Sequence, residues 1–204
     1  MKFYNSIGPN PRVVRMFMAE KGIEIPSEQV DLMKGDNRRA PYSTTKNSMG
    51  QMPALELDNG HCVTEITAIC EYLEDTHPNP PLVGANPEQK AETRKWTRRV
   101  DLNICEPLAA GFRYSQGLPL FQSRIPTIPE AADGLKNVAQ HYVKWLDGEM
   151  DGKEFLCGKR LTLADILLFC FIDFGGQVGQ PLNPEFKNVT AWFNRMKDRP
   201  SAKA

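Results

Sequence analysis

The chain has no apolar run long enough to cross a lipid bilayer. Its longest one, residues 166–172, is far shorter than the roughly 20 residues that a membrane-spanning helix needs. Residues 1–6 also lead into no apolar signal segment. We therefore expect a cytoplasmic protein with no membrane partner.

Paired cysteines are also lacking, because the five cysteines are odd in number, scattered and without a C-x-x-C motif. They are Cys62, Cys70, Cys105, Cys157 and Cys170. That pattern predicts reduced, mostly buried thiols. It excludes a protein-based redox pair and a cysteine-rich metal site, and the histidines show no metal-ligand spacing, so we predict no metal.

The chain carries no excess of either charge. Lysine plus arginine and aspartate plus glutamate both number 25, so nothing points to nucleic acid or another polyanion as a partner. The apolar content of 41% is enough for a buried core and argues against disorder.

The N-terminal part predicts elements in the order β-α-β-β-β-α. They are a strand at 2–5, a helix at 12–21, a strand at 25–32, one helical turn near 37–42, a hairpin at 54–63 and a helix from Glu65. A helix between the first two strands makes them parallel, and Asp58-Asn59-Gly60 is a typical hairpin turn. Asn10 and Thr64 are the predicted N-caps of the two helices.

Prolines end this part of the chain. Three of them within residues 78–81 cannot continue a helix, so we predict a linker at 78–87. Beyond it the pattern is helical, with helices near 88–115, 131–150 and 184–197. The clearest helix start is at Thr162, which forms a capping box with Asp165, and losing this cap should cost about 1 kcal/mol.

Two motifs organise the chain. The first is the strand start Gly50-Gln51-Met52-Pro53-Ala54-Leu55, and the second is the helix start Glu65-Ile66-Thr67-Ala68-Ile69. Together they resemble the glutathione-binding half of the cytosolic glutathione S-transferase superfamily. The resemblance covers the whole chain. It implies a thioredoxin-like α/β domain at 1–77 and, after the linker, an all-helical glutathione transferase domain at 88–204.

The resemblance implies glutathione as the substrate and assigns its contacts. A cis bond between Met52 and Pro53 would aim the Met52 backbone at the cysteinyl part of the tripeptide. Glu65 would bind the γ-glutamyl ammonium, and the N-terminus of the following helix would bind the γ-glutamyl carboxylate. Gln51 is a further expected glutathione contact, because it belongs to the same motif as Met52 and Pro53.

The residue that would activate the thiol departs from the usual pattern. Family members place a tyrosine, serine or cysteine between the first strand and helix, and here that turn has none at the usual place. Asn10 lies best, because Pro9-Asn10-x-Arg12 resembles bacterial nu-class and yeast prion-like members that use an asparagine. Ser6 is an alternative contact, and Asn10 as a purely structural cap is another.

Further departures and weaker candidates remain. Ile66 replaces the serine or threonine that usually binds the γ-glutamyl carboxylate. Only the Ile66 backbone N–H, helped by Thr67, would remain for this contact, which implies weaker glutathione binding. Lys34 or Asn37 would approach the glycine carboxylate, unless these are only solvated loop residues. Phe112, Arg113 and Tyr114 are candidates for the electrophile pocket, with core or rim packing as the alternative.

The resemblance implies a homodimer with a detoxifying role. Charged residues along 94–101 could line a dimer cleft, although a plain polar helix face is the simpler explanation of that stretch. The expected reaction is attack of the glutathione thiolate on a small electrophile. Two alternatives stay open: glutathione-dependent reduction of disulfides or peroxides, and a non-catalytic binding or regulatory protein on the same scaffold.

Overall fold

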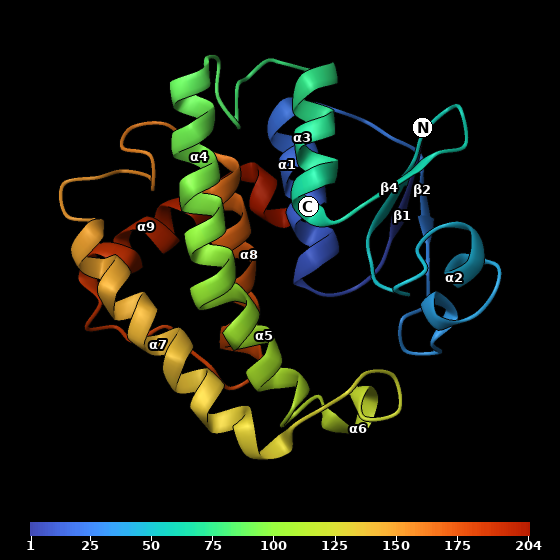
Figure 1. Cartoon of the computed structure of the whole chain (residues 1–204). Coiled ribbons are helices and arrows are strands. Elements are labelled where there is room, and N and C mark those ends of the chain that lie inside the picture. Colours follow the sequence, from blue (N-terminus) through green and yellow to red (C-terminus); the bar gives the residue numbers. More distant parts are fainter. The chain divides into compact units, whose positions relative to one another are not determined.

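The computed structural model describes all residues, 1–204, and divides them into two compact units (Figure 1). The first comprises Met1–Pro81 together with Lys203–Ala204, and the second Leu82–Ala202. Residues 78–86, where the division falls, contain no helix or strand. No helix of either unit has the length and apolar character to cross a membrane.

The first unit is built on a four-stranded mixed sheet with strand order β2-β1-β3-β4. Its strands are β1 (Lys2–Asn5), β2 (Ser27–Gln29), β3 (Ala54–Glu56) and β4 (Cys62–Thr64). β1 pairs with β2 in parallel, while β3 is antiparallel to both β1 and β4. This is the predicted thioredoxin-like order of elements, and the prediction is confirmed.

Three helices accompany the sheet: α1 (Pro9–Lys21), α2 (Tyr42–Thr45) and α3 (Ile66–Thr76). α1 and α3 lie side by side on one side of the sheet, and the short α2 lies on the other (Figure 1). Residues at helical spacing on α1, such as Val13, Val14 and Phe17, are fully buried, which is the core-facing stripe that the sequence pattern predicts.

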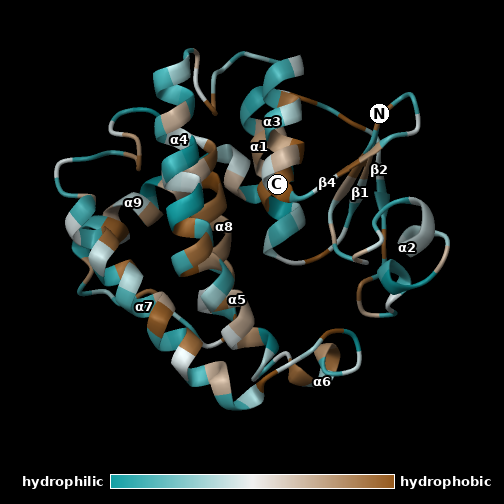
Figure 2. Ribbon diagram, in the orientation of Figure 1, coloured by the Kyte–Doolittle hydropathy of each residue, from teal (hydrophilic) through white to brown (hydrophobic).

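The second unit is entirely helical, as predicted. It contains α4 (Pro87–Val100), α5 (Glu106–Arg113), α6 (Leu118–Phe121), α7 (Ala132–Glu149), α8 (Leu163–Gln177) and α9 (Lys187–Lys197), with a 3₁₀ turn at Pro129–Ala131. A last 3₁₀ turn, Pro200–Lys203, lies where the chain returns to the first unit. α8 is the core helix, since residues 163–172 are buried without exception and are coloured mostly as hydrophobic (Figure 2).

The predicted long helix near 88–115 is continuous along the chain, but its hydrogen-bonding pattern changes in the middle. α4 passes into α5 through a π-helical segment, Asp101–Cys105. Pro107 gives a physical reason, because it has no N–H to donate and its ring crowds the carbonyl one turn earlier. A wider turn before the proline relieves that conflict, and π-helical segments are typically of this short kind.

Two predicted helix caps are wrong. Helix α1 begins at Pro9 with Gly8 as its N-cap, at φ 101°, so Asn10 lies inside the first turn. Proline is favoured at the first helical position because its missing N–H would be unpaired there anyway. Helix α3 begins at Ile66 with Glu65, not Thr64, as its N-cap.

Two element boundaries also differ from the prediction. The second strand covers only Ser27–Gln29 of the expected 25–32. The last helix begins at Lys187, because a turn comes first in which the Phe186 N–H bonds to the Asn183 carbonyl.

Candidate functional site

The register of the sheet brings three segments of the first unit to the same end of three neighbouring strands. Tyr4 on β1 pairs with Ala54 on β3, which in turn pairs with Thr64 on β4. β3 runs against the other two strands, so the residues after Tyr4, before Ala54 and after Thr64 all leave the sheet at this end. The two motifs and the β1–α1 turn therefore meet there.

In the β1–α1 turn the Asn10 side chain is accessible, whereas the Ser6 side chain is buried. The Asn10 side chain is half-buried, and no other group of the chain bonds to its amide. Pro9 and Pro11 have no N–H, so the Asn10 N–H is the one free donor of this helix's first three residues. Ser6 is only 2% exposed, and its Oγ donates to the Val30 carbonyl at 2.8 Å.

The strand start at β3 carries unpaired backbone groups. The Met52–Pro53 bond is cis, and Met52 is 6% exposed. Neither the N–H nor the C=O of Met52 makes a hydrogen bond within the chain. Buried backbone groups are nearly always paired, so an unpaired N–H and C=O here indicate a partner from outside the chain.

The start of α3 is a second place with open donors. Its N-cap, Glu65, is exposed and has φ 68° and ψ 128°, and it is the only non-glycine residue of the chain with positive φ. No side chain caps this helix, and no acidic residue lies in its first turn. Its free N–H groups and its dipole therefore favour an anion.

The loop candidates lie differently from one another. Lys34 is exposed and pairs with Asp31 at 3.3 Å, and the Lys34 backbone N–H lowers the pKa of that carboxyl below its usual value. Asn37 is only 3% exposed, and its Nδ2 donates to the Gly50 carbonyl at 2.6 Å, so it is not a solvated loop residue. Its amide nitrogen holds the residue two positions before Met52, and the predicted contact of Asn37 with the glycine carboxylate stays a prediction.

Two residues that sequence reasoning missed hold the next peptide. The Gln51 carbonyl accepts hydrogen bonds from Tyr42 Oη at 2.7 Å and from Asn47 Nδ2 at 3.1 Å. Both side chains are buried. They lie in or next to the polar connection before the motif, where neither periodicity nor a turn signal marks them.

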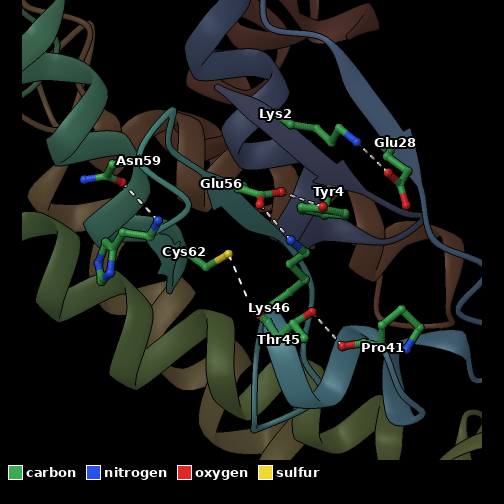
Figure 3. A network of polar contacts seen from close by, with 10 residues as sticks. Lys2, Tyr4, Glu28, Pro41, Thr45, Lys46, Glu56, Asn59 and Cys62 are labelled. Carbon is green, nitrogen blue, oxygen red and sulfur yellow. Dashed lines mark hydrogen bonds and ion pairs between the residues drawn. The ribbon is translucent and has the colours of Figure 1, made fainter.

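A polar network lies beside these residues, on the sheet face that carries α2 (Figure 3). Tyr4 Oη donates to Glu56 Oε2 at 2.7 Å, and Lys46 Nζ contacts Glu56 Oε1 at 2.8 Å. Hydrogen bonds from Lys46 and Tyr4 lower the pKa of Glu56. Lys46 follows α2 directly, so this ion pair ties the end of the helix to β3.

The electrophile candidates lie at the end of α5 in the helical unit, and all three are half-buried. The Phe112 ring makes edge-to-face contacts with Phe174 at 5.1 Å and with Phe121 at 6.1 Å between centroids. Arg113 forms an ion pair with Glu106 at 2.7 Å. Phe112 and Arg113 thus have packing and charge partners within their own unit.

All five cysteines are free thiols, and three of them, Cys70, Cys105 and Cys170, are buried. Burial raises the pKa of Cys62 and Cys157, the two half-buried thiols. No group of three or more histidine, cysteine, aspartate or glutamate side chains is arranged to hold a metal ion.

The chain combines a thioredoxin-like unit, which has open backbone donors at a cis-proline and at a helix start, with an all-helical unit that follows it. This combination is the one that glutathione transferases have, and family models match both parts of the chain. The model of the glutathione S-transferase N-terminal domain matches residues 3–81, and that of the C-terminal domain matches residues 115–200. The chain belongs to the glutathione S-transferase family.

Individual relatives support this over the full length. Glutathione S-transferase 2 of Saccharomyces cerevisiae is 28% identical over 96% of this chain and 84% of its own. The crystal structure of a glutathione S-transferase domain-containing protein from Marinobacter aquaeolei VT8 is 32% identical, covers 98% of this chain and 99% of its own, and superposes with a TM-score of 0.92. The crystal structure of Gtt2 from Saccharomyces cerevisiae gives the same TM-score at 28% identity, covering 100% of this chain and 99% of its own.

Other relatives carry a different name. Elongation factor 1-gamma of Carassius auratus is 28% identical over 83% of this chain. The chain spans only 37% of the length of that relative.

Proposed function

We propose that the protein is a glutathione transferase that binds glutathione at the end of its sheet and presents the thiolate to a small electrophile. The observation that carries this proposal is the convergence of Asn10, Met52 and Glu65 through the pairing of Tyr4 with Ala54. Each of the three offers polar groups that the chain itself leaves without a partner.

The tripeptide fits these groups in order. Glu65 receives the γ-glutamyl ammonium, and the N–H groups of Ile66 and Thr67 receive the γ-glutamyl carboxylate, with the Gln51 side chain beside them. The strained backbone of Glu65 supports this assignment, since such outliers cost about 1–3 kcal/mol and concentrate at functional sites.

The cysteinyl part pairs with the Met52 N–H and C=O next to Pro53 as an extended strand would. Lys34 is the exposed cation for the glycine carboxylate. Asn37 serves this end of the site through Gly50 rather than by touching the ligand, because its amide is buried against that carbonyl.

Asn10 is the proposed thiol contact. A free cysteine thiol has a pKa of about 8.5, and lowering it by two units needs about 2.7 kcal/mol of preference for the anion. The Asn10 side-chain amide and backbone N–H, at the positive end of α1, can supply much of this. Ser6 is the weaker candidate, because its hydroxyl proton is used by Val30.

The cellular setting belongs to the same proposal: a cytoplasmic homodimer with domains at 1–77 and 88–204, a detoxifying role, and an electrophile pocket lined by Phe112, Arg113 and Tyr114. The half-buried rings of Phe112 and Tyr114 support an apolar pocket wall.

Two other functions use the same site. The asparagine-type turn favours reduction of small disulfides or peroxides by bound glutathione, which needs no protein cysteine. The relatives named elongation factor 1-gamma favour a non-catalytic binding protein. Conjugation of an aryl halide, reduction of a hydroxyethyl disulfide, or neither activity despite binding would separate the three.

The proposal is tested by the ultraviolet absorbance of the bound glutathione thiolate, titrated against pH. In the wild type the thiol should titrate well below free glutathione, and in Asn10→Ala it should move back toward the free value. Asn137→Ala, on the exposed side of α7, is the matched control and should behave as the wild type.

Two results would change the conclusion. If wild type and Asn10→Ala both titrate like free glutathione, the binding-protein alternative replaces the enzyme. If the wild-type thiol is acidic and Asn10→Ala leaves it so, another group activates the sulfur.

A further inference from the structure

The chain leading to Met52 is held by its carbonyl groups, one after another. Asn37 Nδ2 donates to the Gly50 carbonyl, and the next carbonyl, that of Gln51, accepts from both Tyr42 Oη and Asn47 Nδ2. The three side chains are at most 6% exposed. A surface loop needs no such treatment, because water would satisfy the same carbonyl groups.

The Gln51 carbonyl matters because it belongs to the same peptide unit as the Met52 N–H. This unit is planar and trans, since the cis bonds of the chain lie elsewhere, and in a trans peptide the C=O and N–H point in opposite directions. Fixing the oxygen toward Tyr42 and Asn47 therefore turns the Met52 N–H away from them. That N–H has no partner in the chain.

Tyr42 is itself held firmly. Its ring packs edge-to-face on Tyr4 at 5.9 Å between centroids, within a small core that also includes Met52. α2, on which Tyr42 lies, is tied to the sheet at its other end, where Lys46 pairs with Glu56 and the Cys62 thiol approaches the Thr45 carbonyl (Figure 3).

Asn47 is fixed by a second bond. Its Oδ1 accepts from the Met49 N–H at 3.0 Å, while its Nδ2 faces the Gln51 carbonyl. The amide can therefore take only one orientation, with the nitrogen on Gln51. Gly50 lies between these contacts at φ 58°, where an added Cβ would come within 3.0 Å of the Asn37 carbonyl oxygen, so the segment packs too closely for a side chain there.

We propose that Tyr42 and Asn47 are positioning residues for glutathione: by holding the Gln51 carbonyl, they orient the Met52 N–H toward the cysteinyl carbonyl of the tripeptide before it binds. This inference rests on the proposed function. The two residues touch neither the ligand nor its sulfur; they remove a rotation of the Gln51–Met52 peptide that binding would otherwise have to freeze.

The consequence is a division between binding and chemistry. Tyr42→Phe removes one oxygen and keeps the ring on Tyr4. Asn47→Asp keeps the acceptor for Met49 and replaces the donor to Gln51 by an oxygen that repels it. Losing one such bond should weaken glutathione binding by roughly 3- to 10-fold, while the pKa of the bound thiol and kcat stay as in the wild type.

Tyr4→Phe is the matched control. It also removes a hydroxyl hydrogen bond from a buried tyrosine of the same cluster, but that bond goes to Glu56 and not to Gln51. A general loosening of the cluster would affect Tyr4→Phe and Tyr42→Phe alike, whereas the positioning role predicts weaker glutathione binding in Tyr42→Phe alone.

The experiment is calorimetric titration of the full chain with glutathione for the wild type, both variants and the control, with KM, kcat and the bound-thiol titration measured beside it. A raised Kd and KM for glutathione in Tyr42→Phe and Asn47→Asp, with unchanged thiol pKa, supports the inference. Unchanged Kd in both variants, or an equal rise in Tyr4→Phe, overturns it. No binding by the wild type would instead overturn the proposed function.

Discussion

At the scale of single residues, Glu65 is the position where a substitution should affect glutathione binding most and the stability of the fold least. Its positive φ is a property of the backbone, and its side chain is exposed, so Glu65→Ala keeps the backbone conformation and removes only the carboxylate. We expect the free energy of unfolding to change by less than about 0.5 kcal/mol. Glutathione affinity should fall by roughly 10- to 100-fold, the value of a charged hydrogen bond.

Urea unfolding and calorimetric titration of the same preparations measure the two effects. Glu65→Gln, which keeps an acceptor without the charge, should lie between the wild type and Glu65→Ala. An unchanged affinity in Glu65→Ala would mean that the γ-glutamyl ammonium binds elsewhere.

The residues of the site differ in how far the sequence could reveal them. Met52 and Glu65 follow from short motifs, because the chemistry of a cis-proline strand and of a helix start depends on local order. For Asn37 the sequence suggested a ligand contact or a solvated loop residue but not its bond to the Gly50 carbonyl, and Tyr42 was missed. Both residues bond to carbonyl groups of Gly50 and Gln51. These contacts form only when the chain folds, so no local sequence pattern predicts them.

At the scale of elements, Asp165 joins three parts of the helical unit. It is fully buried, and its oxygens accept from the N–H of Leu156, from the N–H and hydroxyl of Thr162 at the start of α8, and from Trp192 Nε1 on α9. Burial raises the pKa of this carboxyl, and the donors oppose that rise.

Asp165→Asn should therefore destabilise the chain more than the loss of the Thr162 cap does. An amide nitrogen cannot accept, so the donors on that side of the side chain lose their acceptor, and at least one N–H then faces another donor, at a cost of about 2–4 kcal/mol. Urea unfolding measures it, and Asp133→Asn, whose side chain is 93% exposed, should change little. Equal effects in the two variants would contradict the proposed role of the buried carboxylate.

Element types were predictable and their ends less so. The capping box at Thr162 was predicted correctly, because all its parts lie within four residues. The caps of α1 and α3 were not, because Gly8 and Glu65 hold backbone conformations with positive φ, which differ from the extended conformation of the N-caps that the sequence pattern predicts. The π-helical segment before Pro107 was also missed, since a proline inside a helical pattern predicts a break more readily than a widened turn.

At the scale of the whole molecule, the sequence predicted an α/β part followed by a helical part, because proline density, turn signals and the change of period are spread along the chain; that the α/β part is thioredoxin-like was implied by the family resemblance. The sequence predicted the class of ligand better than the reaction, because the motifs that bind glutathione are contiguous in the sequence. The choice between conjugation and reduction depends instead on which sulfur reacts and on which co-substrate it attacks.

The thiols of the molecule give a test of that choice. Burial raises the pKa of Cys62, Cys105 and Cys157, so the thiolate fraction of each at neutral pH is smaller than that of free cysteine. None of them is suited to act as the nucleophile. Cys70 and Cys170 are buried as well, so we expect the reacting sulfur to belong to bound glutathione in either reaction.

We expect a Cys62→Ser/Cys157→Ser double variant, which lacks the two half-buried thiols, to retain the wild-type rate in both aryl halide conjugation and disulfide reduction. In the wild type, alkylation of these thiols by iodoacetamide should be slow at pH 7 and accelerate as the pH rises toward their elevated pKa values, without loss of activity in step with the modification. A rate reduced 10-fold or more in the double variant, in either reaction, would show that a protein thiol takes part and that the asparagine-based mechanism is incomplete.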